Sequence, residues 1–219
     1  MSRGRSRAAS GPYDVPVAQR KLHDRFFLQA KADGYLARSA YKLKEIQERR
    51  RLIRPGHRVL DCGCAPGSWL QVGAELVGPG GVVVGVDLKP VEHPMPRQVV
   101  TIVGDLGAAR AEDLVREAGG RFDVVLSDMA PNTSGHGDDL ISARLCRGVL
   151  ALLPGVLRPG GALAMKIFEG AEYQGVLRET GAMFTTARGF KPKACRDVSR
   201  ELYIIAEGFD APGARGTLP

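Results

Sequence analysis

Residue types that carry acid–base and hydrogen-bonding chemistry stand at the ends of short apolar runs in this sequence. Four carboxylates and one amine share this position: Asp61, Asp87, Asp105, Asp128 and Lys166. In an open α/β sheet, ligands bind in the crevice outside the carboxyl ends of the strands. We therefore expect these five side chains to gather at one edge of a sheet and to form one site there.

Lys166 is the most informative of the five because it interrupts the apolar run Ala162–Ile167. A buried lysine costs free energy unless it has a carboxylate partner or a task. Asp128, at the end of another strand-like run, is the expected partner. A purely structural ion pair is the alternative interpretation, since buried pairs also occur without a catalytic role.

A glycine-containing loop follows the first strand-like run and has the sequence DCGCAPGSW, from Asp61 to Trp69. Gly63 and Gly67 let the backbone pass close to a ligand where a Cβ would collide. The loop lacks the GxGxxG fingerprint and the Walker lysine, which favours a nucleoside with an uncharged or cationic tail over a pyrophosphate. Trp69, the only tryptophan, has two interpretations: core packing, or one wall of the cofactor pocket.

These residues need elements that hold them, and hydrophobic periodicity predicts those elements. The expected strands are Arg58–Asp61, Gly81–Val86, Val99–Val103, Phe122–Leu126, Ala162–Ile167 and Glu201–Ala206, with a possible short one near Thr185–Phe190. The expected helices are Leu36–Ile53, Ser68–Val77, Ala109–Ala118, Asp139–Leu157 and Ala171–Met183. Alternation of apolar strands with helices predicts an α/β fold with a doubly wound, mostly parallel sheet.

Length and composition limit the classes of protein to which the chain can belong. The chain has 219 residues, of which 44% are hydrophobic and 25% charged, values typical of a folded domain rather than a disordered chain. No run approaches the roughly 18 apolar residues of a membrane helix, so no membrane partner is expected. We expect a flexible basic arm over 1–20, one domain over 21–209 and a tail over 210–219.

The net charge of +7 is uneven, since residues 1–58 contain 15 Lys and Arg against 5 Asp and Glu. A basic N-terminal quarter is typical of a protein that docks a polyanion such as nucleic acid, although a solvated basic tail has the same composition. The four cysteines match neither a metal-ligand set nor a secreted disulfide framework. They predict no metal and a cytoplasmic location; the Arg- and Ser-rich start leaves the mitochondrial matrix as the alternative.

Two segments narrow the reaction. The D-x-G-x-x-x-G loop resembles motif I of the S-adenosylmethionine-dependent methyltransferases, which implies that Asp87 binds the cofactor ribose and Asp105 the adenine amino group. Helix capping is the alternative role for both. The loop after the fourth strand, SDMAPN, has no aromatic residue to stack a flipped base and no cysteine after Pro131. Amino and cytosine-C5 methylation are therefore disfavoured, which leaves an alcohol such as a ribose 2′-hydroxyl.

From about Leu22 to Phe209 the chain resembles the FtsJ/RrmJ family of 2′-O-ribose RNA methyltransferases. The Lys-Asp-Lys-Glu tetrad of that family matches four separate motifs, RSAYKL, SDMAPN, KIFEG and SRELY. The resemblance implies a seven-stranded, Rossmann-like class I fold with S-adenosylmethionine as cofactor. The implied catalytic residues are Lys42, Asp128, Lys166 and Glu201. The implied cofactor contacts are Gly63, Gly67, Trp69, Asp87, Asp105 and Asp128.

The short chain resembles the family members that methylate a uridine in the A loop of 23S rRNA within the large ribosomal subunit. This implies rRNA as the partner and a monomeric enzyme. Methylation of tRNA or of mitochondrial rRNA, and a non-catalytic ribosome-assembly role, are the alternatives. A non-catalytic module would lose tetrad residues, and a nicotinamide dehydrogenase would need the missing GxGxxG loop.

The implied reaction is an in-line attack of the 2′-oxygen on the sulfonium methyl group. A lysine of ordinary pKa, about 10.4, is protonated at neutral pH and cannot accept the hydroxyl proton. Burial and the nearby charge of Lys42 would favour a neutral Lys166, which could then act as the general base. Lys166 could also act as a steering group, and the sequence leaves both roles open.

Overall fold

A single seven-stranded sheet organises the chain. The computed structural model describes residues 17–131, 137–195 and 199–210, and for residues 17–24 it describes the backbone alone. The strand order is β3-β2-β1-β4-β5-β7-β6, and β7 runs antiparallel to both of its neighbours. The strands are β1 Arg58–Cys62, β2 Val82–Asp87, β3 Val99–Val103, β4 Phe122–Ser127, β5 Leu157–Phe168, β6 Phe184–Phe190 and β7 Glu201–Phe209. The predicted doubly wound, mostly parallel sheet is confirmed, and β6 is the strand that the sequence suggested only as possible.

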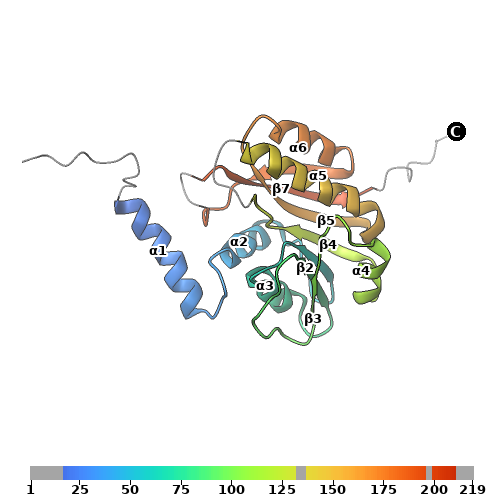
Figure 1. The fold of residues 1–219 in the computed structure, drawn as a ribbon, viewed down its shortest axis with the longest axis horizontal. Coiled ribbons are helices and arrows are strands. Elements are labelled where there is room, and N and C mark those ends of the chain that lie inside the picture. The colour runs from blue at the N-terminus through green and yellow to red at the C-terminus, as the bar shows by residue number, and fades with distance from the viewer. Residues whose placement is uncertain (1–16, 132–136, 196–198, 211–219) are drawn as a thin grey trace, which may run out of the picture.

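Helices cover both faces of the sheet (Figure 1). The helices α2 Ala40–Arg50 and α3 Ser68–Val77 lie on one face. The helices α4 Ala111–Glu117, α5 Asp138–Val156 and α6 Tyr173–Gly181 lie on the other. All five helices were predicted, and α2 is shorter than its predicted range because the chain turns before Ala40 and after Arg50.

The helix α1, Val17–Ala32, was not predicted and lies beside the sheet rather than on it (Figure 1). It begins inside the expected basic arm, whose first 16 residues lie outside the described part of the chain. From Arg25 onward most of its side chains are exposed, including Phe27 and Leu28. The described side chains of this helix, from Arg25 to Ala32, form no continuous buried face, and hydrophobic periodicity did not reveal the helix.

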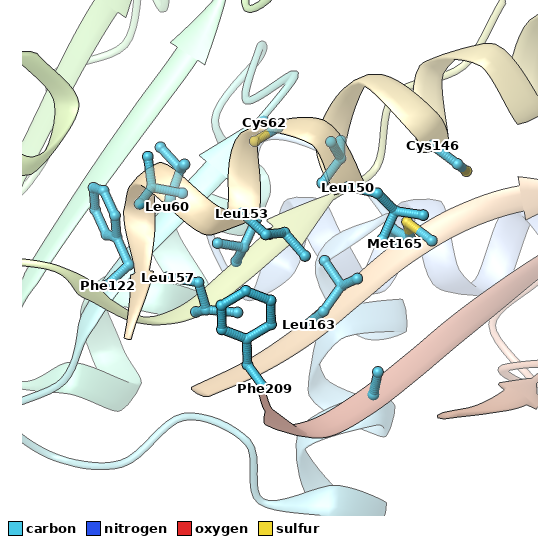
Figure 2. Close-up of a cluster of buried hydrophobic side chains, with 14 of the residues drawn as sticks. Leu60, Cys62, Phe122, Cys146, Leu150, Leu153, Leu157, Leu163, Met165 and Phe209 are labelled. Carbon is cyan, nitrogen blue, oxygen red and sulfur yellow. The ribbon is translucent and has the colours of Figure 1, made fainter. Parts of the chain in front are cut away.

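The core has two layers because strand side chains alternate between the faces of the sheet. One layer lies under α4, α5 and α6, and Figure 2 shows its labelled members, among them Leu60, Phe122, Leu153 and Leu163. Cys62 and Cys146 pack there as small apolar side chains. The other layer lies under α2 and α3. Among the described residues, no helix is long and apolar enough to cross a membrane.

The order of the strands reverses between β1 and β4, which are neighbours in the sheet but far apart in the chain. The connections from β1 run outward to β2 and β3 on one side, and those from β4 run to β5 on the other. Such a switch point leaves a crevice at the carboxyl ends of the two central strands. The loops after β1 and β4 are therefore the place to look for a ligand site.

Candidate active site

The four tetrad residues lie together at this edge of the sheet. Lys42 comes from α2, Asp128 follows β4, Lys166 lies on β5 and Glu201 begins β7. The Nζ atom of Lys42 donates to Oε2 of Glu201 at 2.8 Å. The Nζ atom of Lys166 lies 3.1 Å from Oδ1 of Asp128 and also donates to the carbonyl oxygen of Asp128. The structure thus brings together residues from four elements, and their catalytic roles stay a prediction.

The register between β5 and β7 explains how two of these residues reach the same side. Lys166 lies opposite Tyr203 across the antiparallel pair, and Phe168 lies opposite Glu201. Because alternate residues of a strand share a face, Lys166, Tyr203 and Glu201 all point toward the layer that contains α2 and α3. A shift of one residue in this register would send all three to the other face.

The ion pair of Lys42 with Glu201 is largely buried, with the lysine side chain 6% exposed. Burial by itself lowers the pKa of Lys42, but the carboxylates of Asp128 and Glu201 outweigh it and raise this pKa above its ordinary 10.5. Burial likewise raises the pKa of Glu201, and the charge and hydrogen bond of Lys42 outweigh that effect and lower it. The raised pKa favours the cationic form of Lys42 at neutral pH.

Tyr203 is part of this cluster, and sequence reasoning missed it. Its hydroxyl donates to Oδ1 of Asp128 at 2.5 Å. Complete burial, followed by the charge and hydrogen bond of Asp128, raises the pKa of Tyr203 well above 10, so the phenol stays protonated. The signal in the sequence is its position two residues after Glu201, which places both side chains on one face of the strand.

A pocket of about 510 Å³ opens beside the tetrad at the carboxyl ends of β1, β2 and β4. Its lining includes four of the residues expected to bind a cofactor: Gly63, Asp87, Asp105 and Asp128. Leu88, Met129 and Leu145 of α5 add apolar walls, and Arg144 of the same helix lines the pocket with a charged side chain. Asp128 belongs to both the pocket and the tetrad, so a ligand in the pocket lies next to the buried lysines.

Backbone N–H groups hold the two pocket carboxylates. Asp87 accepts the amide hydrogens of Ala65 and Lys89, both at 2.9 Å, with one oxygen each. Asp105 accepts the amide hydrogen of Gly107 at 2.9 Å. The bonds from Lys89 and Gly107 are turn interactions within two residues, whereas Ala65 belongs to the loop after β1. Asp105 does not cap α4, whose N-cap residue is Arg110 and has no side-chain cap hydrogen bond. A carboxylate oxygen can accept more than one hydrogen bond, so both side chains retain capacity for a ligand.

Gly63 sits where a side chain would not fit. Its φ is 79°, and an added Cβ would lie 2.3 Å from the side chain of Met129 on the pocket wall. Gly67, with a φ of 113°, faces Leu36, Val91 and Met95 instead of the pocket. Its predicted contact with a cofactor stays a prediction, and in the structure it forms the turn that starts α3.

Of the two interpretations of Trp69, the structure favours core packing for its ring. The side chain is buried, its Nε1 donates to the carbonyl of Ser39 at 2.8 Å, and the ring stacks on Tyr203 with centroids 5.8 Å apart. It does not line the pocket. Any contact with a cofactor would have to come from the backbone of Trp69, at the first turn of α3, where helices leave N–H groups free.

Asp61 is a buried carboxyl without a partner. Neither oxygen has a hydrogen-bond partner among the described residues. Burial, together with the charges of Asp128 and Asp87, raises the pKa of Asp61 well above 3.8. Buried polar groups are nearly always hydrogen-bonded, so this one calls for a donor that the described residues do not supply. The sequence placed Asp61 at the edge of the sheet without giving it a role.

Together, the pocket and the tetrad can hold a nucleoside-like donor beside a buried amine. The pocket offers carboxylates to hydroxyl, amino or cationic groups, and the tetrad offers Lys166, fixed by Asp128, next to it. Such a site suits transfer of a group from a bound donor to an acceptor that enters from solvent.

Comparison with known proteins agrees with this geometry. A family model described as FtsJ-like methyltransferase matches residues 35–209. The chain is 47% identical over 186 residues to the ribosomal RNA large subunit methyltransferase E of Syntrophobacter fumaroxidans, covering 84% of this chain and 94% of that protein. It is 44% identical over 184 residues to the protein of the same name from Desulfatibacillum aliphaticivorans, covering 83% and 88%.

A solved structure has the same fold. A crystal structure described as a ribosomal RNA methyltransferase from Plasmodium falciparum superimposes with a TM-score of 0.71 and 27% identity. The match covers 81% of this chain and all of that one. The family model, which matches residues 35–209, spans all seven strands and the helices α2 to α6, from which the residues of the site come.

Proposed function

The chain belongs to the FtsJ-like methyltransferase family, and we propose that it transfers a methyl group from S-adenosylmethionine to a ribose 2′-hydroxyl of RNA. The observation that carries this proposal is the pairing of Lys166 with Asp128, a residue that also lines the pocket. The curated relatives are named for the large subunit RNA of the ribosome, which supports a uridine of 23S rRNA as the acceptor.

The pocket fits S-adenosylmethionine in size and in chemistry. Asp87 would accept hydrogen bonds from the ribose hydroxyls and Asp105 one from the adenine amino group, and Gly63 leaves room for the backbone to approach the ligand. The carboxylate of Asp128 on the pocket wall favours a ligand with a cationic group beside it. When bound, the cofactor supplies a methyl group activated by a sulfonium.

The residues of the tetrad then handle the acceptor. With the donor held in the pocket, Lys166 would lie beside the acceptor hydroxyl, would orient its oxygen toward the methyl group and could take up the proton that the hydroxyl loses. Asp128 holds the Lys166 amine at 3.1 Å, next to the pocket that Asp128 also lines. General-base assistance contributes about 10²–10⁴-fold, and alignment of the two reacting groups contributes further.

RNA would reach the site along the basic N-terminal elements. Arg25 and Lys31 on α1 are exposed, as are Arg49 and Arg51 at the end of α2, whose Lys42 lies in the tetrad. Such side chains bind phosphates and give an affinity that falls with salt.

The four cysteines are free and buried, which fits a reducing compartment and supports a cytoplasmic location. The domain bounds 21–209 and a monomeric state are part of the same proposal.

The experiment that tests the function is a methyl-transfer assay with tritiated S-adenosylmethionine on three RNAs. Immature large ribosomal subunits, naked 23S rRNA and total tRNA serve as acceptors. We expect label in large-subunit rRNA, in a dinucleotide that resists alkaline hydrolysis because its 2′-oxygen is methylated. Label in tRNA alone would overturn the acceptor. Cofactor binding without transfer to any of the three RNAs would identify a non-catalytic module instead.

A further inference from the structure

Tyr203 lies at the centre of the tetrad and is fully buried, with no exposed surface. It is the cross-strand neighbour of Lys166, and its hydroxyl donates to Oδ1 of Asp128 at 2.5 Å. The Lys166 amine lies 3.1 Å from the same oxygen. One carboxylate oxygen therefore receives a neutral donor from one side and an amine from the other.

Residues of α3 and of the start of α2 hold the ring of Tyr203 in place. It stacks on Trp69 of α3, with centroids 5.8 Å apart and ring planes 28° apart. The indole N–H of Trp69 is fixed on the carbonyl of Ser39, and the Ser39 hydroxyl is 2.8 Å from that of Ser68. The Tyr203 hydroxyl therefore has little freedom to move away from Asp128.

Core packing alone would not require this hydroxyl. Phenylalanine would fill nearly the same volume and stack on Trp69 in the same way. A buried hydroxyl costs free energy unless it is hydrogen-bonded, and its partner here is an ionisable carboxyl rather than a backbone carbonyl. The terminal torsion of an aspartate is broad, so an Asp128 without this bond could rotate.

We propose that Tyr203 is a positioning residue for methyl transfer, whose hydroxyl fixes the Asp128 carboxylate so that Oδ1 holds the Lys166 amine beside the pocket. The inference rests on the proposed function for its effect on rate, and on geometry alone for its effect on Asp128. A misplacement of about 1 Å in a reacting group can cost on the order of 10²-fold in rate.

The first test is the Tyr203→Phe variant. We expect kcat to fall by about 10- to 100-fold, because Lys166 loses its alignment, while the Kd for S-adenosylmethionine and for RNA change by less than about twofold. The matched control is Tyr35→Phe, which removes a hydroxyl that donates to the carboxylate of Glu75 at 2.8 Å, away from the tetrad. Its kcat should equal that of the wild type. A wild-type kcat in Tyr203→Phe would overturn the inference.

A double-variant cycle with Asp128→Asn shows whether Tyr203 acts through Asp128. In single-turnover assays, adding Tyr203→Phe to Asp128→Asn should lower the rate by less than about twofold. A further drop as large as in the wild-type background would mean that Tyr203 acts elsewhere and would overturn the inference. Trp69→Phe, which keeps an aromatic stack but loses the N–H bond to Ser39, should lower kcat by a smaller factor of about 2–5.

Crystal structures of the wild type and of Tyr203→Phe test the same inference without any assay. We expect the Asp128 carboxylate to rotate in the variant and the contact between Lys166 Nζ and Asp128 Oδ1 to lengthen. An unchanged Asp128 would overturn the inference whatever the activity. If the wild type methylates no RNA, the proposed function fails, and this structural comparison still decides the role of the Tyr203 hydroxyl.

Discussion

The two halves of the sheet edge are built in different ways, although both consist of charged side chains at strand ends. In the half formed by β2 and β3, Asp87 and Asp105 accept hydrogen bonds from backbone amides that follow within a few residues or belong to the adjacent loop. In the half formed by β4, β5 and β7, buried side chains hold one another. Lys42 and Glu201, which form its shortest ion pair, are 159 residues apart in the chain.

This difference indicates what fixes the positions of the charged side chains in each half of the sheet edge. A carboxylate held by its own turn depends on local backbone, so it can move with that loop when a ligand enters. A buried lysine held by a carboxylate from another element depends on the register of the sheet and on the packing of α2 and α3. We expect changes in the first half to alter affinity for the cofactor and changes in the second half to alter rate.

The largest effect should come from Lys166→Ala. Loss of the amine removes both proton acceptance and steering, so methyl transfer should fall by about 10³-fold or more at saturating substrates. The Kd for S-adenosylmethionine should stay within about threefold, because Lys166 does not line the pocket. Radiometric transfer and calorimetric titration measure the two quantities separately.

Lys166→Arg sharpens the same prediction. Arginine keeps the positive charge but cannot be deprotonated in a protein, so it can steer the acceptor without accepting its proton. A rate as low as that of Lys166→Ala would identify the lysine as the base, and a rate near the wild type would identify a steering group. Turnover of Lys166→Ala at the wild-type rate would exclude Lys166 from the mechanism altogether.

A smaller effect, and of the opposite kind, should follow Asp87→Ala. The Kd for S-adenosylmethionine should rise by about 10- to 100-fold, since a charged hydrogen-bond acceptor is lost, with kcat at saturation changed by less than about fivefold. The Kd of Asp87→Asn, which keeps one acceptor oxygen, should lie between the Kd of the wild type and that of Asp87→Ala. Asp113→Ala, at an exposed aspartate of α4, is the control and should leave both constants unchanged. An unaltered Kd in Asp87→Ala would show that the half formed by β2 and β3 does not determine the affinity for the cofactor.

The smallest effect concerns stability. Glu201→Gln removes the partner of a buried lysine and should lower the free energy of unfolding at neutral pH by about 1–3 kcal/mol. The pKa of Glu201 is lowered in the folded protein, so its contribution is present above its ordinary value of 4.5 and is lost as the pH falls through the lower folded value. The difference between variant and wild type should therefore narrow in acid.

Urea unfolding at a series of pH values measures this difference. The raised pKa of Lys42 means that the lysine side of the pair persists as the pH rises past 10.5, so no loss is expected between neutral pH and that value. Glu207→Gln, at an exposed position of the same strand, is the matched control and should behave like the wild type. A difference that stays constant down to pH 3 would show that the ion pair does not stabilise the fold.

The sequence was sufficient to predict the positions of the carboxylates in the half formed by β2 and β3, because these positions depend on local structure. The strand-end positions of Asp87 and Asp105 followed from the lengths of the apolar runs, and the structure places both in the pocket. The pairing of Lys166 with Asp128 was also predictable, because a lysine inside an apolar strand needs a carboxylate on a neighbouring strand. Helix α1 was not predicted from periodicity, and its described side chains from Arg25 onward form no continuous buried face.

Sequence by itself determined the order of strands and helices, the chemistry available at the sheet edge and the four motifs of the tetrad. Only the tertiary structure decided that Tyr203 reaches Asp128, that Trp69 stacks on its ring, and that Asp61 has no hydrogen-bond partner within the described part of the chain. The physical reason is that local spacing decides which face a side chain occupies within its own strand. Which side chains then meet is decided by register and packing between elements that lie far apart in the chain.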